Sequence, residues 1–161
     1  MCIRDSQDSD SILSDPASHR HPGKYPVHES NTLSDSIINI QVIVQGLGHG
    51  DDKIPHIAQV LKNDDNELVR HEAAFSLGQM SYSSAIPPLI DSTLNDPSMF
   101  VRHEAAIALG VVGNKEAKET LQKALNDPDK PVVESAVVAL SNIEFMETLS
   151  KNEKFAKLTG G

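Results

Sequence analysis

Tryptophan is missing from this 161-residue chain, cysteine occurs once, and aromatic residues make up only 4% of it. A core poor in rings but supplied with alanine, leucine, valine and isoleucine favours closely packed helices over a β-sandwich. Because Cys2 is the only cysteine, no disulfide can form within the chain, and we expect a cytoplasmic protein. No apolar run is long enough to span a bilayer, and no secretory signal is expected.

Positive charge is also scarce, because 14 lysines and arginines stand against 23 aspartates and glutamates. The formal net charge is therefore −9, and the isoelectric point is about 5.1. A surface of this sign repels the phosphate backbone, so we expect no nucleic-acid partner and no membrane partner. The same charge favours a cationic partner or a metal cation.

One helical phrase occurs twice, as LVRHEAAFSLG at 68–78 and as FVRHEAAIALG at 100–110. The copies are 32 residues apart. A repeat of this period indicates a stack of helical hairpins, none of which can bury its apolar face alone. The predicted fold is therefore an all-α solenoid of about 3.5 hairpins with a disordered N-terminal tail.

Two alternating sets of helices follow from the apolar spacing. The A helices are expected at 52–63, 84–95 and 115–126, and the B helices at 35–47, 67–80, 99–112 and 130–146. Short turn-like links separate them, and prolines such as Pro55 and Pro87 are tolerated in a first helical turn. The B helices are expected to supply the core through Val69, Ala73, Ala74, Leu77, Val101, Ala105, Ala106, Leu109, Val132 or Val133, Ala136, Val137 and Leu140. These features resemble HEAT-type repeats of the phycobilisome-lyase-like group.

Composition divides the chain into three parts. Residues 1–34 are polar and predict a disordered tail or linker, 35–146 form the repeat domain, and 147–161 form a C-terminal tail with a possible short helix. The opening residues 1–6 resemble a translated sequencing adapter, so we expect coding sequence to be missing upstream. The tail histidines are expected to be solvated, because no rigid frame supports them.

The repeated phrase places His71 and Glu72 on one B helix and His103 and Glu104 in the same slots of the next. Stacked helices would present both imidazoles to one cation, and imidazole with carboxylate suits iron, manganese or zinc. The alternative is a solvent-facing slot copied with its repeat. The slots hold Gln41 and Val42 in the first B helix and Glu134 and Ser135 in the last, so only the two middle repeats carry the pair.

Arg70 and Arg102, which precede the histidines, are expected to form surface pairs with turn carboxylates such as Asp64, Asp65 or Asp96. Such pairs contribute little to stability, about 0–1 kcal/mol. An HExxH zinc-protease motif is absent.

Three phrases together resemble one half of the deoxyhypusine hydroxylase family: LVRHEAAFSLGQM with AIPPLI, FVRHEAAIALGVVG, and PVVESAVVALSNIEF. The resemblance covers 42–146. It implies an iron-dependent monooxygenase that hydroxylates deoxyhypusine in the translation factor that carries hypusine. It also implies a di-iron centre between two half-domains with four His-Glu motifs, of which this chain holds two. The second half would be a missing segment or a homodimer partner. This chain could correspond to the N-terminal or to the C-terminal half of the enzyme.

By this resemblance His71 and His103 bind Fe(II). One carboxylate ligates iron and the other holds the cationic substrate amine; Glu72 is the preferred ligand, and Glu104 is a candidate for both roles. Alternatives left open are a non-enzymatic scaffold or lyase-type chaperone that binds a basic partner, and a metal enzyme of another reaction type.

Overall fold

The computed structural model describes Ile40 and residues 50–159, with side chains as far as Asn152. Every regular element within these residues is helical. In chain order they are η1 (Asp51–Lys53), α2 (Ile54–Asn63), α3 (Glu67–Met80), η2 (Ser83–Ala85), α4 (Ile86–Asn95), α5 (Met99–Val112), η3 (Lys115–Ala117), α6 (Lys118–Ala124) and α7 (Lys130–Thr159).

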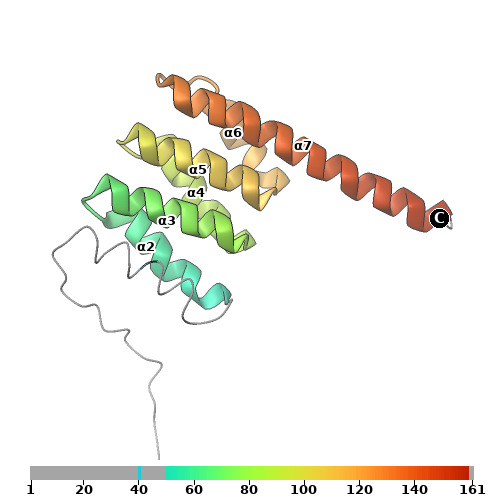
Figure 1. Ribbon diagram of the computed structural model, residues 1–161, viewed down its shortest axis with the longest axis horizontal. Coiled ribbons are helices and arrows are strands. Elements are labelled where there is room, and N and C mark those ends of the chain that lie inside the picture. Colours follow the sequence, from blue (N-terminus) through green and yellow to red (C-terminus); the bar gives the residue numbers. More distant parts are fainter. Residues whose placement is uncertain (1–39, 41–49, 160–161) are drawn as a thin grey trace, which may run out of the picture.

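The helices form two layers (Figure 1). The B helices α3, α5 and α7 lie side by side in one layer, and the A helices α2, α4 and α6 pack behind them. This arrangement confirms the predicted all-α solenoid of helical hairpins. The predicted tail at 1–34 and most of the first B helix lie outside the described residues; Ile40, from that helix, is helical and buried.

Short 3₁₀ turns precede the A helices, which therefore begin two or three residues later than the spacing predicts. Pro55 and Pro87 lie at the first positions of α2 and α4, where a missing N–H leaves no hydrogen bond unmade. Helix α5 ends at Gly113, whose φ of 69° is the left-handed conformation that glycine adopts without strain.

The core between the layers consists of small and branched aliphatic side chains. All predicted core residues of α3 and α5 are buried, as are Val132 and Ala136 of α7. The prediction is wrong for Val137, which is 51% exposed, and Leu140 is only half-buried. Both lie on the side of α7 that a further repeat would cover, and the described residues include none. The core of α7 instead includes Ala139 and Ile143.

Two glycines inside helices set how closely the B helices approach. A Cβ atom on Gly78 would lie 2.9 Å from the Cα of Ala108, and one on Gly110 would lie 2.8 Å from the Cα of Ala139. Backbone therefore meets backbone at these two points. The sequence suggested paired alanines as the close contact; the structure adds these glycines, one turn further along each helix.

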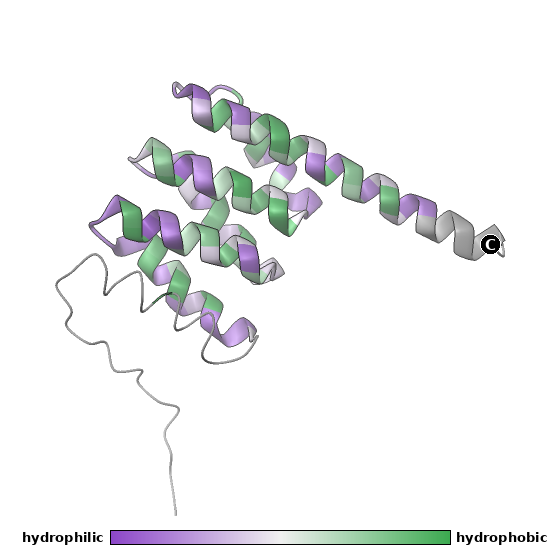
Figure 2. Ribbon diagram, in the orientation of Figure 1, coloured by the Kyte–Doolittle hydropathy of each residue, from purple (hydrophilic) through white to green (hydrophobic). Residues whose placement is uncertain are grey.

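Helix α7 extends well beyond the other helices (Figure 1). The predicted helix 130–146 and the short helix expected in the tail are one continuous element, since no glycine or proline interrupts 132–159. An ion pair of 2.7 Å between Lys118 and Glu147 ties the first part of the extension to α6. Apolar and polar residues alternate along α7 (Figure 2). Among the described residues, no helix is long and apolar enough to cross a membrane.

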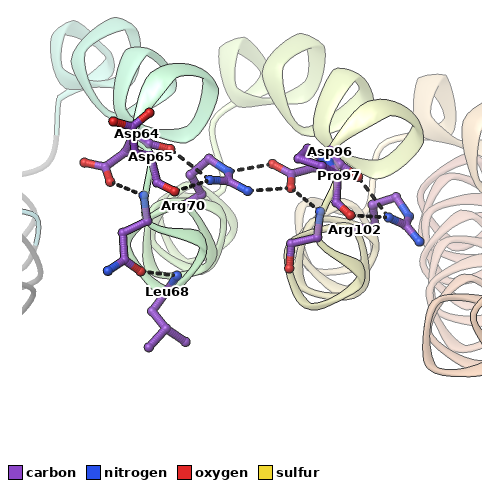
Figure 3. A network of polar contacts seen from close by, with 9 residues as sticks. Asp64, Asp65, Leu68, Arg70, Asp96, Pro97 and Arg102 are labelled. Atoms are coloured by element: carbon purple, nitrogen blue, oxygen red, sulfur yellow. Dashed lines mark hydrogen bonds and ion pairs between the residues drawn. The ribbon is translucent and has the colours of Figure 1, made fainter.

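Two arginines, Arg70 and Arg102, each join one repeat to the next, and Figure 3 shows the contact of Arg70 with Asp96. Arg70 donates from Nε and Nη2 to the two carboxylate oxygens of Asp96, at 2.8 and 2.9 Å. Its Nη1 donates to the carbonyl oxygen of Asp64 in its own hairpin, at 2.8 Å. Arg102 repeats the pattern one hairpin later, with the carboxylates of Asp127 and Asp129.

These pairs were expected at the surface, and that expectation is wrong. The side chains of Arg70 and Asp96 are 10% and 6% exposed, and those of Arg102 and Asp127 are 11% and 9% exposed. The pKa values of both arginines are raised, chiefly by the hydrogen bonds to their aspartates. Burial acts to raise the pKa of Asp127, but hydrogen bonds from Arg102 and from the Asp129 backbone, with the arginine charge, lower it below its usual value.

Replacement of Gly110 by alanine is expected to destabilise the fold by about 1–3 kcal/mol, since the added methyl group overlaps the α7 backbone. The intrinsic helix preference of alanine, about 1 kcal/mol, works in the opposite direction. Ser141→Ala is the matched control, because Ser141 holds the same register position in α7 and is exposed. Urea unfolding of both variants measures the difference. A more stable Gly110→Ala protein would contradict the close contact.

Replacement of Arg102 by leucine leaves the Asp127 carboxylate buried without its cation. We expect a loss of about 2–4 kcal/mol at neutral pH. Because the folded-state pKa of Asp127 is depressed, its contribution is full above the unfolded value of about 3.9 and is lost as pH falls through the folded value. Wild type and variant should therefore converge in acid, as measured by urea unfolding across pH. Lys123→Ala, which breaks an exposed pair of equal length, should leave the midpoint unchanged.

Candidate metal centre

The four predicted ligands lie one turn into α3 and α5, next in sequence to the arginines that join the repeats. His71 and Glu72 follow Arg70, and His103 and Glu104 follow Arg102. The arginine contacts hold one end of each helix, and the glycine contacts hold it two turns later. The side chains between these points project from helices whose separation and stagger are set by packing.

The structure brings His71 together with Glu104 of the next repeat. The distance from His71 Nε2 to Glu104 Oε2 is 3.3 Å. The Glu104 side chain is 11% exposed, whereas the His71 side chain is 36% exposed. A glutamate in this slot therefore contacts the histidine of the preceding hairpin.

His103 makes the corresponding contact with α7. Its Nδ1 atom lies 2.6 Å from the Ser135 hydroxyl oxygen and 3.2 Å from the carbonyl oxygen of Pro131. Ser135 occupies the slot that Glu104 occupies in α5. The same cross-repeat contact thus recurs with a hydroxyl in place of the carboxylate.

Glu72 is half-buried on α3. The slot that would correspond to it in the first B helix lies outside the described residues. Within the described residues the two glutamates of the repeated phrase differ: Glu104 is buried and contacts an imidazole, and Glu72 is half-buried.

The described residues hold no group of three or more histidine, cysteine, aspartate or glutamate side chains close enough to bind an ion. The convergence of all four predicted ligands on one site stays a prediction. A groove of about 460 Å³ lies beside Arg70 and Asp91, and none of the four residues lines it.

The His71–Glu104 pair has the chemistry and spacing of part of a metal site. An ion bound at about 2.1 Å by two ligands at right angles separates them by about 3 Å. The observed 3.3 Å is close to that value. Imidazole with carboxylate is a donor set for iron, manganese or zinc. The pair fits a metal ion as an incomplete set of two donors, and the structure does not bring His103 close enough to be a third.

Exposed apolar residues border this polar row on both sides. Leu68 and Phe100 precede the histidines by three residues and are 49% and 52% exposed. In the next turn, Phe75, Ile107 and Val138 share one register position and are exposed as well. Apolar side chains gathered beside a polar row are typical of a surface that another surface covers.

Sequence reasoning found the residues but not how they pair. It noted Ser135 in the glutamate slot without predicting its contact with His103. The alignment of the repeats held the signal. Ser135 takes the position of Glu104 in the next helix, so it should contact the histidine of the preceding repeat, as Glu104 does.

Comparison with known proteins defines the class first. The family model for HEAT repeats matches residues 54–141, more than half of the chain, and the chain belongs to that family. More particularly, the chain is a homologue of deoxyhypusine hydroxylase over part of that enzyme.

The curated relatives include enzymes of that name from two fungi and from human. The chain is 48% identical to the Phaeosphaeria nodorum protein over 84 residues, 51% of this chain and 26% of the relative. It is 44% identical to the Neurospora crassa protein over 99 residues, 59% of this chain and 31% of the relative. It is 39% identical to the human protein over 105 residues, which are 65% of this chain and 34% of the relative. The chain thus spans between a quarter and about a third of these relatives.

A solved structure of human deoxyhypusine hydroxylase in complex with glycerol has a similar fold. The TM-score is 0.61 at 30% sequence identity, over 73% of this chain and 47% of that one.

Proposed function

We propose that the chain is part of an iron-dependent deoxyhypusine hydroxylase, and that the open face of α3 and α5 forms part of its metal centre. The observation that carries the proposal is the contact between His71 and Glu104 across consecutive repeats, in a homologue of that enzyme. The substrate would be the deoxyhypusine side chain of the translation factor that carries hypusine.

Geometry supports a different division of roles between the glutamates from the one expected from resemblance. Glu104 lies against the His71 imidazole and is the better placed metal ligand, together with His71. His103 is assigned as a further ligand from the family resemblance, and the second half of the site would have to bring it to the ion. Glu72 is then the carboxylate available for the cationic amine of the substrate. In this assignment the ligand carboxylate is the more buried of the two.

Iron(II) bound here would supply oxygen activation, and the chain supplies binding and orientation. The carboxylates on this face and the net charge of −9 attract a cationic substrate side chain. The apolar residues beside the histidines exclude water once the face is covered, which strengthens charge interactions inside.

We further propose that a second half-domain, or a second copy of this chain, covers the face. The described donors form an incomplete set, and the apolar rows at Phe75 and Phe100 are open. A facing domain would complete both.

Metal titration tests the ligand assignment on the chain itself. With Fe(II) under anaerobic conditions, or Co(II) as a spectroscopic probe, Glu104→Gln and His71→Ala should each weaken binding by at least about tenfold. Glu72→Gln should stay within about twofold, because it removes no ligand. Glu134→Gln, an exposed change in the histidine slot of α7, is the matched control. Isothermal calorimetry gives the affinities. If Glu72→Gln weakened metal binding by about tenfold and Glu104→Gln left it unchanged, the two roles would be the reverse of those proposed here.

Activity is tested after the chain is joined to a second deoxyhypusine hydroxylase half-domain. A deoxyhypusine peptide should gain one oxygen atom by mass spectrometry, and His71→Ala with His103→Ala should abolish the gain. Absence of metal uptake by the joined protein, with tight binding of a basic protein that survives these substitutions, would establish the alternative of a non-enzymatic scaffold.

A further inference from the structure

We propose that Ser135 is a positioning residue for His103: it holds the ring so that Nδ1 carries the proton and Nε2 offers its lone pair to the metal. The inference rests on the proposed function, because it assigns a purpose to one contact at the edge of that site. It names a residue outside the repeated His-Glu phrase, contributed by the following helix.

Three distances favour one tautomer of His103. His103 Nδ1 lies 2.6 Å from the Ser135 hydroxyl and 3.2 Å from the Pro131 carbonyl oxygen, and that hydroxyl lies 2.9 Å from the same carbonyl. A carbonyl oxygen can only accept, so the Ser135 hydroxyl donates its proton to Pro131. The lone pairs of the Ser135 hydroxyl oxygen are then free to accept a hydrogen bond from His103. An N–H at Nδ1 of His103 can donate to both the hydroxyl oxygen and the Pro131 carbonyl oxygen. In the opposite tautomer the lone pair of Nδ1 would face a lone pair of the Pro131 carbonyl oxygen, and the two would repel each other.

The hydroxyl is held in place by packing. Ser135 is 5% exposed, next to the fully buried Ala136, and its hydrogen bond one turn back along α7 fixes its rotamer. The contact of Gly110 with Ala139 fixes how α7 lies against α5. The acceptor for Nδ1–H is therefore in position before any ligand arrives.

The chemistry of the slot explains why a hydroxyl is suited to this repeat. In α5 the same position holds Glu104, whose carboxylate lies at Nε2 of His71 and would share a metal ion with it. At His103 a neutral hydroxyl lies at Nδ1 on the other side of the ring, and Nε2 is left as the basic nitrogen. A ring nitrogen that donates to a fixed oxygen orients the ring and makes the opposite nitrogen a better metal ligand.

The first measurement needs no metal. Long-range proton–nitrogen correlation spectra of the full chain, with ¹⁵N-labelled histidine in mildly alkaline buffer, report which ring nitrogen is protonated; the His103 signals are assigned by their loss in His103→Gln. Wild type should show the Nδ1–H form. Ser135→Ala removes the 2.6 Å contact and leaves only the 3.2 Å contact with Pro131, so part of the His103 population should shift toward the Nε2–H form that free histidine prefers in water; Ser135→Thr should restore Nδ1–H.

The second measurement is Co(II) affinity of the same proteins. Ser135→Ala should bind about tenfold more weakly, and Ser135→Thr should bind as wild type does. Ser76→Ala is the matched control, since it removes a buried hydroxyl where the next two repeats have Ala108 and Ala139. Circular dichroism confirms that all variants fold.

The outcomes separate this inference from the function it rests on. An Nε2–H ring in a wild-type chain that binds metal, or a Ser135→Ala protein with unchanged tautomer and affinity, would overturn the positioning role alone. An Nδ1–H ring in a chain that takes up no metal, even when joined to a second half-domain, would overturn the proposed function and with it the purpose assigned to Ser135.

Discussion

The register between neighbouring B helices is the constraint on which the rest of the structure depends. It is set at two points: the bidentate contact of Arg70 with Asp96, and the backbone contact of Gly78 with Ala108. The first is specific in direction because both guanidinium and carboxylate are planar. The second permits only one depth of approach. A slip of one residue would rotate the side chains by about 100° and separate His71 from Glu104.

A repeat of identical hairpins would present identical contacts, and this chain uses small departures to make neighbouring sites different. The glutamate slot holds a carboxylate in α5 and a hydroxyl in α7, and these approach opposite nitrogens of their histidines. One histidine thereby has a carboxylate oxygen at Nε2, and the other has a hydroxyl oxygen at Nδ1. The solenoid supplies equivalent positions, and substitution at one slot supplies the chemical difference between them. In the proposed function, the chemical roles would follow from these exceptions to the repeat rather than from the repeat itself.

The helices α3 and α5 could be predicted to the residue, because the duplicated phrase states their apolar spacing twice. The starts of the A helices were less accurate, since proline marks a first turn but does not tell whether a 3₁₀ turn precedes it. Val137 was misplaced because burial there requires a following helix, which local spacing does not report. The pairing of His71 with Glu104, rather than with its sequence neighbour Glu72, depends on stagger between helices and is invisible in a single phrase. The same reason hid the contact of Ser135.

The arginine contacts also decide the electrostatics of the candidate metal centre. Arg70 and Arg102 immediately precede the histidines, and free guanidinium groups there would oppose a bound cation. Each is instead paired with a largely buried aspartate of the next repeat, and its Nη1 donates to a carbonyl oxygen of its own hairpin. Arg102 also pairs with the more exposed Asp129. The charges of Glu72 and Glu104 are then not offset by their nearest cations in sequence. The interaction that sets the helix register thus also keeps this face negative, and one device accounts for both the position of the donors and their attraction for a cation.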